Sequence, residues 1–390
     1  MIPASGAEQP WASDASGEAD QKLIPLPFSP ASEKENLGDH LQTTLSLKRP
    51  LAIPRPSPNN SCMMEPLAFL NGKFLAEKSL AISPIDSGFV LGAAVAEQLR
   101  TFGGKLFRLD DHLARLEASL AWIGLDPGMT RRDFIDVAEE LVAHNHRLLA
   151  EGDDLGLSVV VTPGIYAAYA DEHAASGPTV CVHTYPLPFR LWASKYRTGQ
   201  ALVVANVRQV PSRCWPAELK CRSRMHYFLA DQEAARRENG ARAILLDEHG
   251  YVTEASTANV LVYADDQGLI APPAGTVLRG ISASMLFELA AEKGIPTSMR
   301  PLKPEDLAHA QEVLLTSTPW CLMAVTRFEG RPVGDGEPGP VFRALLAAWS
   351  QRVGVDIVAQ AERFAVRKPG SGAGGKAAQA PVERGPRAAQ

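Results

Sequence analysis

The stretch that decides the fold runs from Glu218 to Ala234 and reads Glu-Leu-Lys-Cys-Arg-Ser-Arg-Met-His-Tyr-Phe-Leu-Ala-Asp-Gln-Glu-Ala. Its later part predicts a helix over Met225–Glu238 that ends at Gly240. Lys220 stands just before this helix and just after a short strand-like segment. Two further segments follow, Tyr-Val-Thr-Glu-Ala-Ser-Thr-Ala-Asn-Val from Tyr251 and Leu-Arg-Gly-Ile-Ser from Leu278.

The composition predicts a folded, soluble chain of more than one domain. Its 390 residues exceed a typical single domain, and 45% apolar and 21% charged residues are ordinary globular values. A net charge of -5 argues against nucleic acid as the main partner, which requires a basic face. No apolar run approaches the roughly 20 residues of a membrane-spanning helix, and the start lacks a signal-peptide pattern. We therefore expect a cytoplasmic protein with small-molecule partners.

The cysteines argue against a disulfide framework and against a metal site. They are odd in number and scattered, and none forms a Cys-x-x-Cys pair. Cys214 and Cys221 are interpreted as small space-filling residues, because no activating pattern accompanies them. The full set is Cys62, Cys181, Cys214, Cys221 and Cys321.

Two ends of the chain are predicted to be disordered. Residues 1–63 are rich in Pro, Ser, Ala and Glu without sustained periodicity, and the tail 366–390 is rich in Gly, Ala and Pro. Met63 and Met64 directly precede the first strand-like segment. A start of translation at this point is a hypothesis that the intact mass of the native protein would test.

The first ordered block, residues 64–186, is predicted to be a small α+β domain. It opens with a hairpin at Asn71-Gly72, and a second hairpin turns at Gly103-Gly104. Leucines at helical spacing predict a helix that Gly124 ends, and Thr130 with Asp133 predicts a capped second helix. The expected buried strands are Leu157–Val161 and Thr179–Val182.

The second ordered block, residues 187–365, is predicted to be a larger α/β domain. Besides the helix already described, helices are expected over Ser282–Lys293 and Pro340–Val353. The expected strands are Ala201–Val207, Ala243–Leu246, Tyr251–Thr253, Val260–Tyr263, Glu312–Thr316 and Leu322–Phe328.

In this order and spacing, the segments closely resemble the class IV (fold type IV) aminotransferases. This family includes branched-chain and D-amino-acid aminotransferases and 4-amino-4-deoxychorismate lyase, and the resemblance extends from Met64 to about Val353. It implies a two-domain α+β fold with pyridoxal phosphate in the cleft between the domains. It also implies a homodimer in which a loop of the neighbouring subunit partly closes the cleft.

The resemblance assigns the two central residues of the chemistry. Lys220 stands where the family keeps the lysine that holds the cofactor, and only a primary amine forms an imine that a substrate amine can displace. Glu254 matches the acid that keeps the pyridine nitrogen protonated. The alternatives are a surface lysine and an exposed turn glutamate, but the spacing of the two residues and the flanking patterns favour the functional interpretation.

Three groups match the family's phosphate contacts. Arg115, in His-Leu-Ala-Arg-Leu, offers a fork suited to phosphate oxygens. Gly-Ile-Ser places the amides of Ile281 and Ser282 at a helix N-terminus. Ser317 and Thr318, in Thr-Ser-Thr, match a third contact. By themselves the short patterns are more often caps or turns, and Arg115 is otherwise a helix-surface charge.

The substrate contacts are where the chain departs from the family. Arg224 lies four residues after Lys220, where transaminases usually keep an apolar or tyrosyl residue and the lyase branch can carry arginine. It either faces the substrate or points outward. Glu97 keeps a family acid, but the aromatic residue that often precedes it is Ala96. The arginine and histidine that trap the carboxylate in D-amino-acid enzymes are absent, because alanines occupy their places. Tyr166, Tyr169 and His173 lie on the same loop and can supply other contacts.

Three functions compete on these residues. The leading hypothesis is a transaminase that acts on an amino acid with an apolar side chain, nearest the branched-chain group, with a keto acid as amino acceptor. The second is 4-amino-4-deoxychorismate lyase, which forms 4-aminobenzoate and pyruvate, and Arg224 favours it; a D-amino-acid or amine transaminase is a further alternative. The third is a non-catalytic binding protein, which the retention of Lys220, Glu254 and Arg115 argues against.

Overall fold

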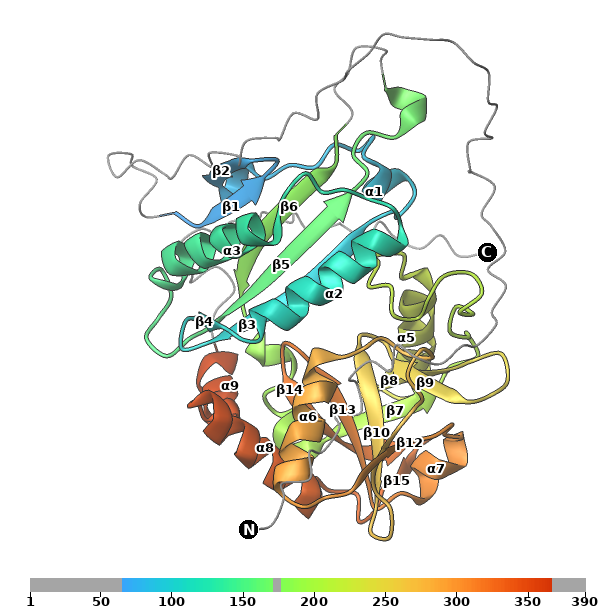
Figure 1. The fold of residues 1–390 in the computed structure, drawn as a ribbon. Helices are drawn as coiled ribbons and strands as arrows, with labels where there is room; N and C mark the ends of the chain where they lie inside the picture. The colour runs from blue at the N-terminus through green and yellow to red at the C-terminus, as the bar shows by residue number, and fades with distance from the viewer. Residues whose placement is uncertain (1–64, 171–176, 367–390) are drawn as a thin grey trace, which may run out of the picture. The chain divides into compact units, whose positions relative to one another are not determined.

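The structure is a computed structural model that describes residues 65–170 and 177–366. The predictions made for residues 1–63 and for nearly all of the tail lie outside these ranges, as does His173. Two sheets organise the described chain, one formed by residues 67–186 and one by residues 200–332 (Figure 1).

The first sheet has six strands in the order β2-β1-β6-β5-β3-β4. The hairpin predicted at Asn71-Gly72 is present, because Leu70 of β1 pairs with Lys73 of β2. Both turn residues have positive φ, 47° and 85°, which is the geometry that favours Asn-Gly. The strands are β1 Leu67–Leu70, β2 Lys73–Ala76, β3 Val95–Phe102, β4 Lys105–Leu106, β5 Leu155–Thr162 and β6 Thr179–Pro186.

Helices α2 (Leu109–Trp122) and α3 (Arg131–His146) pack against this sheet (Figure 1). Thr130 caps α3 with the predicted capping box. Its hydroxyl accepts from the Asp133 amide, and the Asp133 carboxylate accepts from the Thr130 amide. The buried leucines of α2 meet the buried valines of β5 and β6 in one core. The sheet therefore holds α2 with one face buried, and that face carries His112 and Arg115.

The second sheet has nine strands, of which six form a closed ring. The ring runs β10-β13-β14-β7-β8-β9 and closes because β9 also pairs with β10. Closure places the turn between β9 and β10 at one fixed point, with Glu254 opposite Asn259. The strands are β7 Gln200–Val204, β8 Arg242–Leu246, β9 Val252–Ala255, β10 Ala258–Ala264, β11 Gly268–Ala271, β12 Thr297–Met299, β13 Glu312–Ser317, β14 Cys321–Phe328 and β15 Arg331–Pro332.

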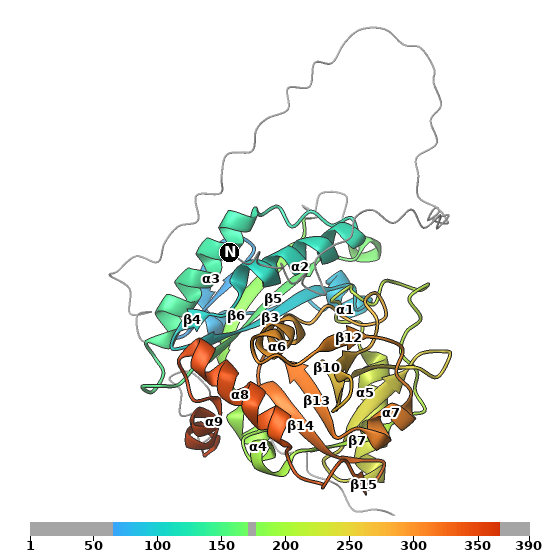
Figure 2. The same ribbon diagram turned by 60° about the horizontal axis from the view of Figure 1, so that its bottom comes forward.

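Three long helices pack on this sheet (Figure 2). Helix α5 (Met225–Arg237) packs on β7 and β8, and helices α6 (Ile281–Glu292) and α8 (Pro340–Val353) pack on β13 and β14. The α8 bounds are those predicted from the sequence, and α5 ends one residue earlier than predicted. The remaining helices are α1 Ser87–Val90, α4 Lys195–Thr198, α7 Pro304–His309 and α9 Ile357–Ala365, with 3-10 turns at Glu77–Ser79, Ala167–Tyr169 and Phe189–Leu191.

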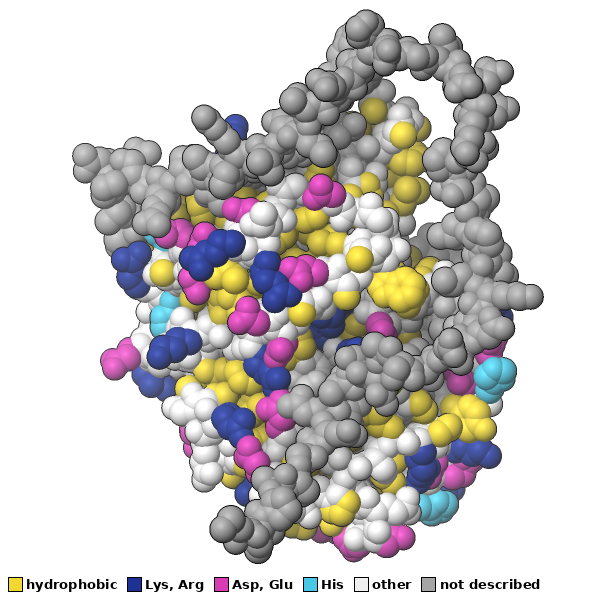
Figure 3. Space-filling view, viewed as in Figure 1, with side chains coloured by type: hydrophobic (Ala, Val, Ile, Leu, Met, Phe, Trp, Pro, Cys, Tyr) yellow, Lys and Arg dark blue, Asp and Glu magenta, His cyan; other side chains and the backbone are white. Residues whose placement is uncertain are grey.

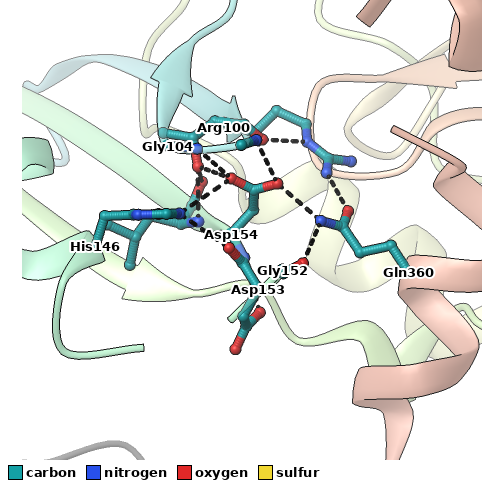
Figure 4. A network of polar contacts seen from close by, with 10 residues as sticks. Arg100, Gly104, His146, Gly152, Asp153, Asp154 and Gln360 are labelled. Carbon is teal, nitrogen blue, oxygen red and sulfur yellow. Dashed lines mark hydrogen bonds and ion pairs between the residues drawn. The ribbon is translucent and has the colours of Figure 1, made fainter. Parts of the chain in front are cut away.

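A buried polar network ties the first sheet to the C-terminal helix α9 (Figure 4). Asp154 accepts from the amides of Gly103 and Gly104, each at 3.0 Å, and from Gln360 Nε2 at 2.8 Å. Arg100 donates to Gln360 Oε1 at 3.0 Å and to the carbonyl oxygen of Pro319 at 3.0 Å. Arg100 is 1% exposed, so a buried cation binds the Pro319 carbonyl oxygen. This contact holds the loop after β13 in place.

The charges on the surface are of both signs, as the composition indicates. Figure 3 shows Lys and Arg side chains interspersed with Asp and Glu on the described part of this face, without a continuous basic area. None of the described helices is long and apolar enough to cross a membrane.

Candidate active site

Two cavities meet at Lys220. We call them the Glu254 cavity, of about 90 Å³, and the Arg242 cavity, of about 300 Å³. Each is named after a residue that lines it and not the other. The residues that line both are Lys220, Arg224, Thr257, Ser317 and Thr318.

The segment that carries Lys220 is held by the first sheet. Lys220 lies in the loop between β7 and α5, and its carbonyl oxygen accepts from the Ala96 amide at 2.9 Å. Two residues on, the Arg222 amide donates to the carbonyl oxygen of Ala94 at 2.8 Å. The loop therefore runs antiparallel beside the start of β3, which fixes the backbone from which the lysine projects.

The environment of Lys220 favours a neutral amine. Burial of the ammonium group, with Arg115, Arg224 and Arg222 nearby, lowers its pKa to about 7, and Glu97 opposes the shift. An amine with this pKa is substantially deprotonated near neutral pH and can act as a nucleophile or a base.

Glu254 lies at the floor of its cavity, at the end of β9. It is 5% exposed, and its Oε1 accepts from the Tyr227 hydroxyl at 2.6 Å and from Gln209 Nε2 at 2.9 Å. Burial raises the pKa of Glu254, against the lowering effect of Tyr227 and the Leu278 amide. A buried carboxylate of this kind favours a protonated nitrogen opposite it.

The Glu254 cavity is also lined by hydrogen-bond donors. Ile281 and Ser282 form the first turn of α6, whose amide groups have no partner within the helix. Thr316 adds a hydroxyl that is buried without a hydrogen-bond partner among the described residues, and Ser317 and Thr318 follow it. A Cβ at Gly280 would lie 1.8 Å from Asn259 Oδ1, so only glycine fits where α6 begins.

Arg115 lines this cavity and forms a fork with Glu97. Its Nε and one terminal nitrogen donate to the two Glu97 oxygens at 2.7 and 2.8 Å, and the other terminal nitrogen donates to the Arg279 carbonyl oxygen at 2.6 Å. His112 Nδ1 lies 2.8 Å from the same carboxylate. Burial alone would raise the pKa of Glu97, but Arg115 and His112 hold it below its ordinary value.

Glu97, for which the sequence analysis predicts a substrate contact, lies outside both cavities. Its side chain is fully buried. Both of its oxygens are taken by Arg115, so the carboxylate fixes the arginine in place. The sequence contained a hint of this arrangement around Glu97, because His112 and Arg115 lie on one face of the same helix.

Arg224 faces the site and does not point outward. It lines both cavities, and its Nε donates to the Cys221 carbonyl oxygen at 3.0 Å. Its guanidinium carbon lies 6.0 Å from the ring centroid of Tyr227. Arg224 thus borders both Lys220 and the residue that contacts Glu254.

Tyr166 is the residue that the geometry does not bring to the site. It follows β5, its ring contacts Tyr169 at a centroid distance of 5.9 Å, and it lines neither cavity in the described chain. The expectation of a substrate contact from Tyr166 therefore has no support within one subunit.

Four site residues were missed by the sequence analysis. Tyr227 and Gln209 bind Glu254, Arg100 holds the loop after Thr318, and Arg242 lines the second cavity. Of these four residues, only Tyr227 could have been inferred from the sequence, because it lies in the first turn of α5, close to the loop that carries Lys220.

Comparison with known proteins identifies the family. The family model for class IV amino-transferases matches residues 94–328. The chain belongs to the class IV aminotransferases. The matched region contains Lys220, Glu254 and both cavities, and enzymes of this class use pyridoxal phosphate.

Individual relatives agree with this assignment. The chain is 28% identical over 280 residues to a Methanocaldococcus jannaschii protein whose name assigns it provisionally to the branched-chain-amino-acid aminotransferases, covering 71% of this chain and 93% of the relative. It is also 28% identical over 278 residues to the D-alanine aminotransferase of Bacillus licheniformis, covering 71% and 94%.

Solved structures show the same fold. The branched-chain amino acid aminotransferase of Escherichia coli superposes with a TM-score of 0.68 at 22% identity, covering 74% of this chain and 94% of that one. The branched-chain aminotransferase of the archaeon Thermoproteus uzoniensis, solved with norvaline, gives a TM-score of 0.65 at 23% identity over 76% and 96% of the two chains. The predicted fold type IV architecture of the α+β class is therefore confirmed.

Proposed function

We propose that this class IV aminotransferase moves an amino group between an amino acid and a keto acid, with Lys220 as its catalytic residue. The observation that carries the proposal is a lysine with a pKa lowered to about 7, between a buried acid and a row of anion donors. We further propose the domain limits 64–186 and 187–365, which separate the two sheets. The side chain of the amino donor is proposed to be apolar, as the names of branched-chain relatives favour.

The residues of the Glu254 cavity fit pyridoxal phosphate. The cofactor needs an amine, an acid at the pyridine nitrogen and an anion cradle. Lys220 and Glu254 supply the first two. The cradle would comprise the amides of Ile281 and Ser282, the hydroxyls of Ser317 and Thr318, and the guanidinium of Arg115, with the unpartnered Thr316 hydroxyl beside them.

Each of these residues then has one role in the reaction. Pyridoxal phosphate, when bound, supplies an exchangeable carbonyl group and a ring that accepts electrons from the substrate α-carbon. Lys220 Nζ takes up and returns the proton of that carbon, which its lowered pKa permits near neutral pH. Glu254 holds a proton at the ring nitrogen, and Tyr227 and Gln209 hold Glu254.

Arg115 contributes through its orientation. Glu97 and the Arg279 carbonyl oxygen occupy most of its donors, so its role is to place positive charge at the rim of the cradle. His112 is fully buried, and burial lowers its pKa, so at neutral pH it acts as a neutral support for Glu97. Glu97 and His112 are therefore positioning residues for Arg115.

An exposed apolar surface beside the site supports a homodimer. Phe89 and Leu91, at and just after α1, are 75% and 58% exposed, and Met225 and Phe228 of α5 are 69% and 61% exposed. The Ser223 hydroxyl donates to the Gly92 carbonyl oxygen at 2.8 Å, which keeps the two groups adjacent. A second copy of the chain would bury this patch, and the partner's loop around Tyr166 would then have a route to the cleft.

Light scattering would test the dimer. Wild type is expected at twice the chain mass, and Phe89→Asp with Phe228→Asp is expected to weaken association. A monomeric wild type would overturn the dimer without affecting the aminotransferase proposal. The cytoplasmic location is a separate proposal, which cell fractionation would test.

One experiment tests the reaction. Purified protein is loaded with pyridoxal phosphate and mixed with a panel of L- and D-amino acids, followed by absorbance and by assay of the released acid. Conversion to pyridoxamine phosphate with release of a keto acid supports the aminotransferase. Pyruvate without this conversion, from aminodeoxychorismate, supports the lyase instead.

The lyase remains the second candidate because of Arg224. This arginine lies at the junction of the two cavities, where it can bind an acidic substrate. The D-amino-acid alternative has relatives in its favour by name. Its carboxylate trap is absent, however, because Ala168 and Ala170 occupy the positions that correspond to it.

A further inference from the structure

The C-terminal helix α9 lies beyond the region that the family model matches. That model ends at residue 328, whereas α9 begins at Ile357. The buried side chains of α9 are Ile357, Gln360, Ala361 and Phe364. Three of these are apolar, so their burial against the rest of the protein is expected. Gln360 is polar and only 7% exposed, and a buried polar side chain requires hydrogen-bond partners.

The partners of Gln360 are a buried cation and a buried carboxylate (Figure 4). Its Oε1 accepts from Arg100 Nη2 at 3.0 Å, and its Nε2 donates to Asp154 at 2.8 Å and to the Gly152 carbonyl oxygen at 3.0 Å. Arg100 is 1% and Asp154 0% exposed, and within the described chain they form no direct ion pair with each other. The Gln360 amide therefore links the two charges, with its oxygen at the cation and its NH₂ group at the anion.

Arg100 in turn binds the turn between β13 and β14, residues 318–320. Its Nη1 donates to the Pro319 carbonyl oxygen at 3.0 Å and to Cys321 Sγ at 3.4 Å. Thr318, at the start of this turn, lines both cavities. Cys321, at its end, has a φ of 63°, which side chains other than glycine rarely adopt. A backbone in this conformation persists only where the surrounding contacts hold it.

Helix α9 also supports a second donor to the same turn. The Tyr196 hydroxyl donates to the Trp320 carbonyl oxygen at 2.7 Å, and Tyr196 is 5% exposed. Tyr196 belongs to α4, which follows the 3-10 turn that contains Phe189. Helix α9 packs on this 3-10 turn, where the Phe364 and Phe189 ring centroids lie 6.1 Å apart. Two successive carbonyl oxygens of the turn are thus bound by side chains that α9 contacts directly or through a neighbouring element.

We propose that α9 positions the β13–β14 turn at the active site, with Gln360 as a positioning residue that acts through Arg100. The proposal rests on the proposed function to the extent that Ser317 and Thr318 contact the cofactor phosphate. Without Gln360, the buried guanidinium of Arg100 loses a hydrogen bond and its link to Asp154. A buried charge that loses a partner is unfavourable, so Arg100 would reorient towards other acceptors and release the Pro319 carbonyl oxygen.

Two substitutions at Gln360 separate positioning from overall stability. Gln360→Met keeps a side chain of similar length but removes the acceptor for Arg100 and the donor to Asp154. Gln360→Glu keeps the acceptor for Arg100 but places a second carboxylate beside Asp154. Both variants are expected to lower Tm, and only Gln360→Met is expected to release the turn. Gln351→Met, at an exposed glutamine of α8, is the matched control.

Amide hydrogen exchange of the full-length, cofactor-loaded protein would measure the turn directly, in a peptide that contains residues 318–321. Exchange in Gln360→Met is expected to be about fivefold faster than in wild type, as the loss of one buried hydrogen bond implies. Exchange in Gln360→Glu and Gln351→Met is expected to stay close to wild type. Dissociation of pyridoxal phosphate, followed by absorbance after dilution, should also be a few-fold faster in Gln360→Met alone.

The outcomes separate this proposal from the proposed function. Wild-type exchange of the turn in Gln360→Met overturns the role of α9, even if the Tm of the variant is lower. Equal acceleration in Gln360→Met and Gln360→Glu also overturns it, because stability alone would then explain the effect. If Gln360→Met does not fold, Gln360→Asn, whose amide is one methylene group too short, replaces it with the same expectation. If exchange changes as expected but wild type does not retain pyridoxal phosphate, the role of α9 stands and the proposed function fails.

Discussion

The two cavities at Lys220 are built in different ways. The Glu254 cavity takes most of its functional residues from short motifs, namely Lys220, Glu254 and the Gly-Ile-Ser and Thr-Ser-Thr segments. The Arg242 cavity assembles single residues from distant elements, such as Gln98 of β3, Lys195 of α4 and Trp320 before β14. The first is the proposed cofactor site, and the second adjoins it at Lys220. Five predictions test this division, from the largest expected effect to the smallest.

Lys220→Ala should remove activity altogether, because no other described amine takes its place at the junction of the cavities. The absorbance of the lysine-bound cofactor and borohydride fixation of the cofactor to the protein measure the loss. Lys293→Ala, at an exposed lysine at the end of α6, is the control. A Lys220→Ala protein that still fixes cofactor upon reduction would show that another residue holds it.

Glu254→Gln should slow the half-reaction by on the order of 100-fold, while cofactor affinity falls much less. The amide keeps partners for Tyr227 and Gln209 but loses the charge that holds the ring nitrogen protonated. Stopped-flow absorbance with the best amino acid would measure the rate. Rates equal to wild type would place Glu254 outside the chemistry.

The pH dependence of cofactor uptake by the apoenzyme should report Lys220. Its pKa is lowered to about 7 by burial and the nearby arginines, so the reactive neutral amine dominates above that pH. Below it, the neutral fraction and the attachment rate should fall about tenfold per pH unit. A midpoint near the ordinary pKa of a lysine side chain would contradict the lowered pKa of Lys220.

Arg115→Ala should weaken cofactor retention by roughly tenfold or more, which corresponds to about 1.5–3 kcal/mol for a charge-assisted contact. Glu97→Gln should give a smaller loss of the same kind, because it releases the arginine without removing it. Titration of apoenzyme measures both. Unchanged affinity in both variants would return Arg115 to a purely structural role.

Arg224→Leu should have the smallest effect on the cofactor and a few-fold effect on the substrate. Because Arg224 borders both cavities, its loss should raise KM most for dicarboxylic or aromatic acids. Steady-state kinetics with the best substrates of the panel would measure it. If neither KM nor cofactor affinity changes, the main argument for the lyase disappears.

Local sequence was enough for most of the elements and for the proposed cofactor residues. The Asn71-Gly72 turn and the Thr130 capping box depend on a few adjacent residues, and both appear as predicted. Glu254 lies near the end of β9, and Ile281 and Ser282 begin α6. Together with Lys220, in the loop before α5, they line one cavity. Their roles remain proposals, but their proximity follows from the order of strands and helices.

The contacts that the sequence did not reveal join residues far apart in the chain. Glu97 and Arg115 are separated by β4 and part of α2, and only their packing shows that the acid holds the arginine. Arg100 was not singled out, because its partners Pro319 and Gln360 lie more than two hundred residues away. Helix α9 was likewise not predicted, and it carries one of these partners.

The sequence by itself determined the family and the fold class and supplied the proposed cofactor residues, since these depend on local patterns in a fixed order. The tertiary structure alone decided which cations line the Arg242 cavity. Lys195, Arg222 and Arg242 have no shared motif, and each looks like an ordinary surface cation in the sequence. They become a set only because closure of the second sheet and docking of the lysine loop on β3 bring them around one space. Their partial burial then weakens the hydration of their charges.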